Sequence, residues 1–410
     1  MDENVTAGLL ARQERGRQIA ASTRLTQAKD NLWIVPSQSH AGHYLVDFGE
    51  KTCTCPDHEA THGLCKHIHA VTFVRLQTTE PDGTVTTHDS MHVTYSQDWP
   101  AYNKAQTMEK EHVLTLLQGL CDGITQPPQE KGRRRLLLSD VVYGSVLKVY
   151  TTMSGRRASS DIRDCQEKGF IDHAPCYNSV FNYLQKPELT PLFKMLIEES
   201  ALPLKAVESN FAVDSTAFGT CNYLRWFDQK YGKPMKLQKW VKAHAMIGTN
   251  TNVVTSIEIT DGDSGDSPQL AGLVDSTAQR FNMKEVSADK AYLAHANLEA
   301  IANVGAVPYI PFKSNSQGQG PEQWQKLWHL FWFRRREFEQ HYHPRSNIES
   351  SFSMIKRKFG GSIRSKLYPA QVNEILAKVL CHNLAVLVHE MYELGIEPEF
   401  WGRPAMAGVH

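Results

Sequence analysis

The sequence has no uninterrupted run of about 18 apolar residues, the length that a helix needs to cross a bilayer. The first 18 of its 410 residues also lack the apolar core of a signal peptide. We therefore expect an intracellular protein without a membrane span, in which thiols stay reduced. By length alone, two to three domains are expected.

A net charge is absent as well, because Lys+Arg and Asp+Glu both number 44. This balance excludes a uniformly basic, histone-like binder and a salt-adapted acidic surface. The charge is nevertheless unevenly placed: residues 1–100 carry 8 basic and 12 acidic side chains, whereas residues 311–366 carry 11 and 4. A locally basic region on a neutral protein indicates contact with a polyanion.

Cysteines are mostly scattered, which makes their one cluster informative. Of eight cysteines, three lie in the pattern Cys53-Thr-Cys55, nine residues, Cys65-Lys-His67. Three thiols and an imidazole form a complete tetrahedral set for zinc, with expected bonds of about 2.0–2.3 Å. A disulfide is disfavoured in a reducing compartment, and unrelated buried residues would not show this spacing. We predict one structural Zn²⁺ held by these four residues.

The cysteine pattern follows a β-hairpin, which alternating apolar and polar residues predict at 32–48. It precedes an apolar helical stretch from His67 to Leu76. In this setting the pattern resembles the SWIM zinc finger over residues 35–75. The resemblance implies a small ββα module that contacts DNA or protein and does not catalyse.

The C-terminal half has an α/β pattern from about residue 208. Strands are predicted at 210–218, 239–249, 252–263, 284–292 and 307–312. Helices are predicted at 267–281, 297–305 and 370–394, with a long amphipathic stretch at 321–358. An antiparallel start followed by βαβ crossovers predicts a mixed central sheet with flanking helices.

The segment upstream of this pattern is predicted to be mainly helical. It covers residues 106–205, with breaks at 125–132 and at 153–160. A stretch rich in Thr, Asp, Pro and Gly at 78–90 predicts a linker or an exposed hairpin before it.

Two aspartates lie at the ends of predicted strands. Asp214 follows the apolar run Phe211-Ala-Val, and Asp289 follows Val286-Ser-Ala. Active sites built on sheets place their catalytic groups at such strand ends. A single aspartate there is more often a helix cap or a turn residue, so neither position decides the function by itself.

A third acid lies on a predicted helix face. Four side chains fall within an arc of roughly 60° on that helix, namely Tyr342, Arg345, Glu349 and Lys356. Pro344 suits its first turn. The ordinary alternative is a solvated, salt-bridging face. That alternative would not explain the aromatic neighbours or the absence of another acid between 340 and 370, and we therefore predict a functional face.

The spacing Tyr342-(2)-Arg345-(3)-Glu349-(6)-Lys356 resembles the Y-R-E-K signature of bacterial and archaeal insertion-sequence transposases of the DDE class. The resemblance also takes in the motifs F-A-V-D-S-T, Lys-Ala-His, G-D-S-P-Q-L and A-D-K-A-Y, and it spans about 208–390. It implies a ribonuclease H-like fold, in agreement with the predicted order of strands and helices.

The resemblance also implies residue roles. The implied catalytic and metal-binding triad is Asp214, Asp289 and Glu349. The implied contacts with transposon-end DNA are Tyr342, Arg345 and Lys356, and the basic run continues through Arg357 and Lys358.

The chemistry of phosphodiester transfer agrees with three carboxylates. It uses two Mg²⁺ or Mn²⁺ ions about 3.5–4 Å apart, and hard cations prefer oxygen ligands. Asp263 and Asp266 are alternative acids, which we interpret as a loop residue and a helix cap.

Further basic runs lie outside the signature. Arg334, Arg335 and Arg336 are candidates for contacts with the DNA backbone. The run from Lys131 to Arg135 and the pair Arg156-Arg157 belong to the helical region, to which we assign recognition of transposon ends. The spacing of Trp324, Trp328 and Trp332 is more typical of a packed helix face than of a base-stacking platform.

These observations predict four segments: a SWIM-type zinc-finger domain with an N-terminal extension at 1–90, a helical DNA-end-binding region at 91–207, a ribonuclease H-like DDE catalytic domain at 208–395 and a tail at 396–410.

The resemblance implies a function and its partners. The enzyme would cut double-stranded DNA at transposon terminal repeats and join the 3′-hydroxyl to target DNA. It would act as a homodimer on paired ends, in the prokaryotic cytoplasm at the nucleoid. The alternatives are a catalytically silent, DNA-binding regulator and a nuclease that hydrolyses without joining.

Overall fold

The computed structural model describes the chain from residue 12 to residue 404 except for residues 13, 17, 21, 22, 24, 30, 39–41, 75, 76, 80–84, 88–97, 130, 133, 221–229 and 231–239. Most of the stretch predicted at 78–90, together with Arg133 of the basic run, lies outside the described residues. The chain divides into two compact units, residues 1–97 and residues 98–410.

The first unit is built on an antiparallel sheet in the order β1-β2-β3-β4. Its strands are β1 (Thr26–Lys29), β2 (Leu32–Pro36), β3 (His43–Asp47) and β4 (Thr52–Cys53). The β2–β3 pair is the hairpin predicted at 32–48. Alternating residues of β2 are buried, which is the pattern of a strand with one face on the core.

The sheet is followed by two short helices, α2 (Pro56–Thr61) and α3 (Lys66–Val74). The sequence predicts α3 but not α2. Helix α2 begins at Pro56, a residue suited to a first turn, and the Cys55 sulfur accepts a hydrogen bond from the His58 amide at 3.4 Å. The module is therefore larger than the predicted ββα unit by two strands and one helix.

A separate short hairpin follows in the chain. Strands β5 (Gln77–Thr79) and β6 (Val85–Thr87) pair antiparallel. Of the two interpretations open for 78–90, the hairpin is the one that these strands support.

The second unit contains a five-stranded sheet in the order β11-β10-β7-β8-β9. Its strands are β7 (Asn210–Gly219), β8 (Trp240–Gly248), β9 (Val254–Asp261), β10 (Glu285–Ala288) and β11 (Val307–Tyr309). Strand β8 runs antiparallel to both β7 and β9, whereas β10 is parallel to both β7 and β11. This is the mixed, ribonuclease H-like sheet that the sequence predicts.

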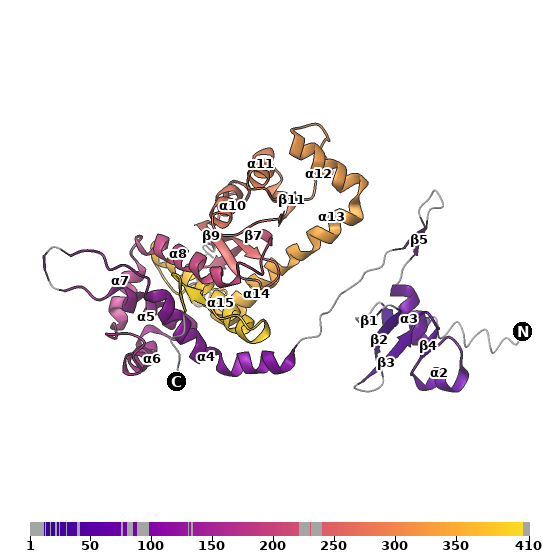
Figure 1. The fold of residues 1–410 in the computed structure, drawn as a ribbon, viewed down its shortest axis with the longest axis horizontal. Coiled ribbons are helices and arrows are strands. Elements are labelled where there is room, and N and C mark those ends of the chain that lie inside the picture. Colours follow the sequence, from indigo (N-terminus) through magenta and orange to yellow (C-terminus); the bar gives the residue numbers. More distant parts are fainter. Residues whose placement is uncertain are drawn as a thin grey trace, which may run out of the picture. The chain divides into compact units, whose positions relative to one another are not determined.

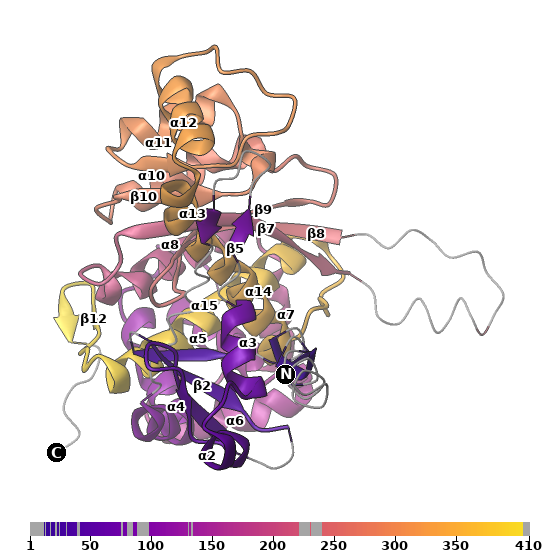
Figure 2. The ribbon, with the colours of Figure 1, turned by 90° about the vertical axis from the view of Figure 1, so that its right-hand side faces the viewer.

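Helices cover both faces of the sheet. The α-helices described in the second unit are α4 (Trp99–Cys121), α5 (Leu138–Tyr150), α6 (Gly155–Glu167), α7 (Tyr177–Leu184), α8 (Leu189–Ala201), α10 (Leu270–Ala278), α11 (His295–Asn303), α12 (Glu322–Phe333), α13 (Arg335–Tyr342), α14 (Ser346–Phe359) and α15 (Tyr368–Glu393). In Figures 1 and 2, α10 and α11 lie on one side of the sheet and α8 and α15 on the other. Helices α4, α5 and α8 share one hydrophobic core with the sheet.

Helix α15 is the central core helix of the second unit. It packs against α4, α5 and α8. It is also the one helix of the described chain that is long and apolar enough to cross a membrane, but 89% of its most apolar 18-residue window is buried inside the protein. Its apolar character is thus accounted for by packing.

The amphipathic stretch predicted at 321–358 is divided into several elements. At Arg334 the backbone leaves the helical region, with φ −129° and ψ 47°, and this separates α12 from α13. A 3₁₀ turn, His343–Arg345, then separates α13 from α14. Pro344 in this turn has no amide hydrogen to continue an α-helix. The residues predicted to share one helix face therefore come from three consecutive elements.

Candidate functional site

Asp214 and Asp289 lie side by side at the middle of the sheet. In the parallel β7–β10 pair, Val213 is opposite Ala288, and each aspartate is the next residue in its chain. Strand β10 ends at Ala288 because Asp289 begins a 3₁₀ turn and its carboxylate accepts the Lys290 amide at 2.6 Å. The predicted strand at 284–292 is correspondingly shorter.

Arg345 joins two of the three predicted acids. Its Nη1 lies 2.9 Å from Asp214 Oδ2, and its Nη2 lies 2.5 Å from Glu349 Oε1. The Arg345 side chain is only 16% exposed, whereas that of Glu349 is 59% exposed. One largely buried guanidinium therefore bridges the strand that carries Asp214 and the helix that carries Glu349.

The environment of Asp214 disfavours an isolated negative charge. Burial raises the pKa of its carboxyl, and the charge of Asp289 acts in the same direction. The Ser215 amide, which donates to Asp214 Oδ1 at 2.7 Å, and the Arg345 guanidinium oppose this rise. Two neighbouring carboxylates of this kind attract a cation.

The three carboxylates are more widely spaced than the ligands of a single ion. In the part of the chain that the structure describes, two groups of ligand atoms lie within 4.8 Å of one another, and the triad is not among them. One is the cysteine cluster. The other, His389, Glu390 and Glu393, lies at the end of α15 and contains a 3.0 Å ion pair between His389 and Glu393. The oxygen donors of the triad suit Mg²⁺ or Mn²⁺, with Arg345 supplying positive charge between two of them.

Lys356 and Tyr342 flank the acids. Lys356 Nζ donates to Thr216 Oγ1 at 2.6 Å, two residues along β7 from Asp214, and burial lowers the pKa of its ammonium. The Tyr342 ring stacks on Phe338, and the Arg345 guanidinium lies 5.8 Å from the centre of the Tyr342 ring.

Helix α14 is thereby attached to β7 at three points. Arg345 and Lys356 contact positions 214 and 216. Beyond the helix, the Gly219 amide donates to Gly361 O, and the Ile363 amide donates to Gly219 O. The strand is thus held by the turn before α14, by the last turns of the helix and by the turn after it.

The remaining predicted DNA contacts differ in their surroundings. Arg357 is exposed. Lys358 forms an ion pair with Glu109 of α4, which also accepts the Tyr150 hydroxyl at 2.7 Å. In the arginine triplet, Arg334 and Arg335 pair with acids of α13, and Arg336 is exposed.

The alternative acid Asp266 belongs to a polar cluster on β8. Its Oδ1 lies 2.6 Å from Lys242 Nζ and 3.4 Å from Nδ1 of the fully buried His244. Because His244 is opposite Ser215 in the β7–β8 pair, its side chain points to the face of the sheet opposite to that of Asp214.

Asn297 connects this cluster to the Asp289 turn. Its amide nitrogen donates to Ser267 O, Ser267 Oγ and Tyr292 O at 3.1, 2.9 and 2.8 Å. Sequence reasoning missed this residue, since a single asparagine in a helix carries no distinguishing signal.

The tryptophans of α12 are mainly packed, as predicted. The Phe312 ring lies 4.8 Å from Trp324 and 5.0 Å from Trp328. Trp332 is 50% exposed and Phe333 is 76% exposed, so the packed face ends before the helix does.

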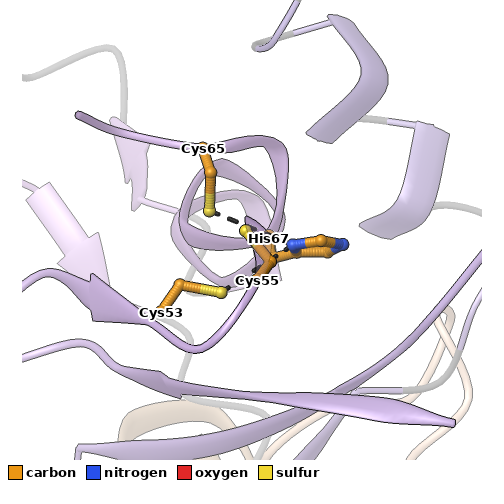
Figure 3. Close-up of side chains that lie close together, drawn as sticks. All are labelled: Cys53, Cys55, Cys65 and His67. Carbon is orange, nitrogen blue, oxygen red and sulfur yellow. Dashed lines mark hydrogen bonds between the residues drawn. The ribbon is translucent and has the colours of Figure 1, made fainter. Parts of the chain in front are cut away.

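The predicted zinc ligands lie together in the first unit. Cys53 ends β4, Cys55 precedes α2, and Cys65 and His67 lie at the start of α3. All four are buried, and Figure 3 shows their side chains pointing toward one another. The ligand atoms lie within 4.8 Å of one another.

The distances between the ligand atoms fit tetrahedral coordination of one ion. His67 Nδ1 lies 3.8 Å from Cys53 Sγ and 4.0 Å from Cys65 Sγ, near the edge of about 3.6 Å that Zn–S and Zn–N bonds of normal length define. The hydrogen bond from Cys53, followed by other contacts, lowers the pKa of the Cys65 thiol to about 3. The donor set and its geometry are those of a structural zinc site.

Two segments of the chain match known families. Residues 205–384 match the family described as the transposase DDE domain. Residues 44–75 match the SWIM zinc finger. The first match contains all three predicted acids, and the second contains all four predicted zinc ligands.

Proposed function

We propose that this chain, which carries a transposase DDE domain and a SWIM zinc finger, cuts DNA at transposon ends and joins the resulting 3′-hydroxyl to target DNA. The observation that carries the proposal is the convergence of Asp214, Asp289 and Glu349 within the matched domain. Two of these acids lie on adjacent parallel strands, and Arg345 joins the third to Asp214.

In this proposal the three carboxylates hold two Mg²⁺ or Mn²⁺ ions. Such ions, when bound, activate the attacking oxygen and stabilise the leaving oxygen. Asp214 and Asp289 approach from the sheet, and Glu349 approaches from α14. The partly buried position of Asp214 excludes part of the solvent, which strengthens its interaction with a cation.

The basic side chains would position the DNA. Arg345 supplies positive charge to the acids before the ions arrive and is then free to bind a phosphate. Lys356 lies two residues along β7 from Asp214, where it can hold the phosphate next to the cut. Arg357 extends the same exposed surface, and Tyr342 holds the Arg345 side chain through its ring.

The other parts of the chain would recognise and pair the ends. We assign end recognition to the helical region, residues 91–207, and the contact with DNA or protein to the zinc module at 1–90. Because two ends must be held together during transfer, we expect a homodimer on paired terminal repeats, associated with the nucleoid.

The test uses the full-length protein loaded with zinc. The substrates are an intact duplex that carries the element's own terminal repeat, a precut duplex with a free 3′-hydroxyl, and a plasmid target. Cleavage of the first and joining of the second, both dependent on Mn²⁺ or Mg²⁺, are expected. Cleavage without joining would indicate a nuclease, and tight binding without cleavage would indicate a DNA-binding regulator.

Arg345→Gln should tighten the binding of divalent ions to the free protein. The substitution removes the cation that bridges Asp214 and Glu349. Two ion pairs of up to about 1 kcal/mol each correspond to a dissociation constant lower by up to about 30-fold. We expect cleavage to fall at saturating Mn²⁺ because a phosphate contact is lost.

The measurement is a Mn²⁺ titration by calorimetry, followed by cleavage at saturating ion. Arg335→Gln is the matched control, since Arg335 forms an ion pair with Glu339 on α13 and contacts none of the three acids. Weaker Mn²⁺ binding in Arg345→Gln would mean that the guanidinium holds the acids in place and does not compete with the ions.

A further inference from the structure

The junction between α5 and α6 gathers basic side chains from three elements. Lys148 lies in the last turns of α5, and Arg156 and Arg157 lie in the first turn of α6. Arg364, from the turn after α14, donates through Nη1 to Thr152 O at 2.6 Å. Residues far apart in the sequence thus place four cations around one short loop.

The first turn of α6 has no side-chain cap. Ser154 precedes the helix in an extended conformation, and its exposed side chain forms no capping hydrogen bond. The first amides of a helix have no acceptor within the helix. They form a binding site for anions when nothing else caps them.

Gly155 allows the Phe181 ring of α7 to approach the first turn of α6 closely. A Cβ atom at this position would lie 2.4 Å from Cζ of Phe181 on α7, which no larger residue could accept without displacing the ring. The Lys148 ammonium lies over the same ring, 5.8 Å from its centre. Lys148 and the first turn of α6 are therefore neighbours across Phe181.

Lys148 adds a largely buried cation to this junction. It is only 6% exposed, and it has no hydrogen-bond acceptor or ion-pair partner among the residues that the structure describes. Burial lowers the pKa of its ammonium, and the charge of Glu374 opposes this. A bound anion would add to the compensation that Glu374 supplies.

The nearby acid is already engaged. Glu374 accepts hydrogen bonds from the amides of Arg364 and Ser365 and from the Ser365 hydroxyl, and it lies 3.8 Å from Lys378. The acids of α6 begin only at Asp161, in the second turn of the helix. The first turn thus faces an excess of positive charge.

We propose that the N-terminal turn of α6, together with Lys148, Arg156, Arg157 and Arg364, binds a backbone phosphate of double-stranded DNA. The proposal rests on the proposed function and specifies which surface of the helical region the DNA contacts. Because Arg364 lies in the segment between α14 and α15, a phosphate bound here is connected through that segment to the helix that carries Glu349.

The test is the salt dependence of DNA binding by the full-length protein. The probe is a fluorescent 40-base-pair duplex of mixed sequence, since phosphate contacts do not depend on sequence, and anisotropy is recorded between 50 and 200 mM NaCl without divalent ions. The slope of log K against log[salt] is negative, and each lost phosphate contact reduces its magnitude by about 0.9. We expect Arg156→Gln/Arg157→Gln to reduce that magnitude by about 1.

Arg163→Gln is the control, because Arg163 is exposed on the same helix but lies beyond the first turn. It should leave the slope nearly unchanged. An unchanged slope in the double variant would overturn the proposed phosphate site.

A second variant separates binding from folding. Ser154→Asp places a carboxylate over the first amides, where it caps and stabilises the helix but occupies the position of the phosphate. We expect an equal or higher Tm together with weaker DNA binding, whereas Ser154→Ala should weaken binding much less. Equal DNA affinities of Ser154→Asp and wild type would contradict the site.

The outcomes distinguish this site from the proposed function. Should the wild type cleave and join ends while the Arg156/Arg157 variant keeps its salt slope, only the phosphate site is wrong. Should the wild type show no salt-dependent binding of DNA, the proposed function is wrong as well.

Discussion

Replacement of Glu349 by Gln is expected to abolish metal-dependent cleavage while DNA binding persists. Glutamine keeps the size of the side chain but removes the negative charge that a divalent ion requires. Metal ions stabilise the transition state by several kcal/mol, which corresponds to a loss of about 10³-fold or more in rate. Because Glu349 is 59% exposed, the substitution should leave the Tm within a few degrees of the wild type.

The measurement is single-turnover cleavage of a terminal-repeat duplex, with binding followed by anisotropy on the same DNA. Glu339→Gln provides the comparison, since Glu339 is an exposed acid nearby that pairs with Arg335. Cleavage by Glu349→Gln at more than about a tenth of the wild-type rate would remove Glu349 from the proposed triad.

Removal of zinc is expected to unfold the first unit and to leave the second intact. Three of the four predicted ligands, Cys53, Cys55 and Cys65, also belong to the hydrophobic core of the first unit. Structural Zn²⁺ contributes about 10–16 kcal/mol to folding in small zinc modules. The loss of this folding free energy should therefore exceed what the small hydrophobic core of the first unit can offset.

The experiment compares wild type, Cys65→Ser and Cys176→Ser by zinc content, calorimetry and limited proteolysis. Cys176 is an exposed thiol of the second unit. Its substitution should therefore leave the zinc content, the calorimetric unfolding and the proteolysis pattern unchanged. For Cys65→Ser we expect zinc to fall from one ion per chain to near zero, and proteolysis to begin within residues 1–97. Full zinc occupancy in this variant would exclude the four-ligand site.

Regular patterns in the sequence carried most of the fold prediction. The five strands of the second unit were predicted from strand-type segments separated by helical ones, and the antiparallel start followed by βαβ crossovers predicted a mixed sheet. The spatial order β11-β10-β7-β8-β9 depends on tertiary pairing and was not predicted.

Departures from prediction arise where one residue decides a local conformation. Helix α2 was missed because its cap is the Cys55 sulfur, and cysteine is not among the usual capping residues. The amphipathic stretch divides at Arg334, where the local sequence gives no helix-breaking signal. Strand β10 ends where Asp289 caps the next turn.

The residues of the candidate site were predicted from the sequence, but the contacts between them were not. The three acids and Arg345 were found from their spacing, and their catalytic and DNA-binding roles stay predictions. That Arg345 would bridge Asp214 and Glu349 depends on the packing of α14 against β7. Such tertiary contacts, like those of Asn297, are not encoded in local periodicity.

The three attachments between β7 and α14 have a mechanical consequence. Asp214, Thr216 and Gly219 are held by the 3₁₀ turn before α14, by α14 itself and by the turn that follows it, and these contacts resist separation of the strand from the helix. The turn at Asp289 is also held, because β10 pairs with β7 and Asn297 donates to Tyr292 O. We therefore expect the three acids to approach shared ions mainly by rotation of the exposed Glu349 side chain.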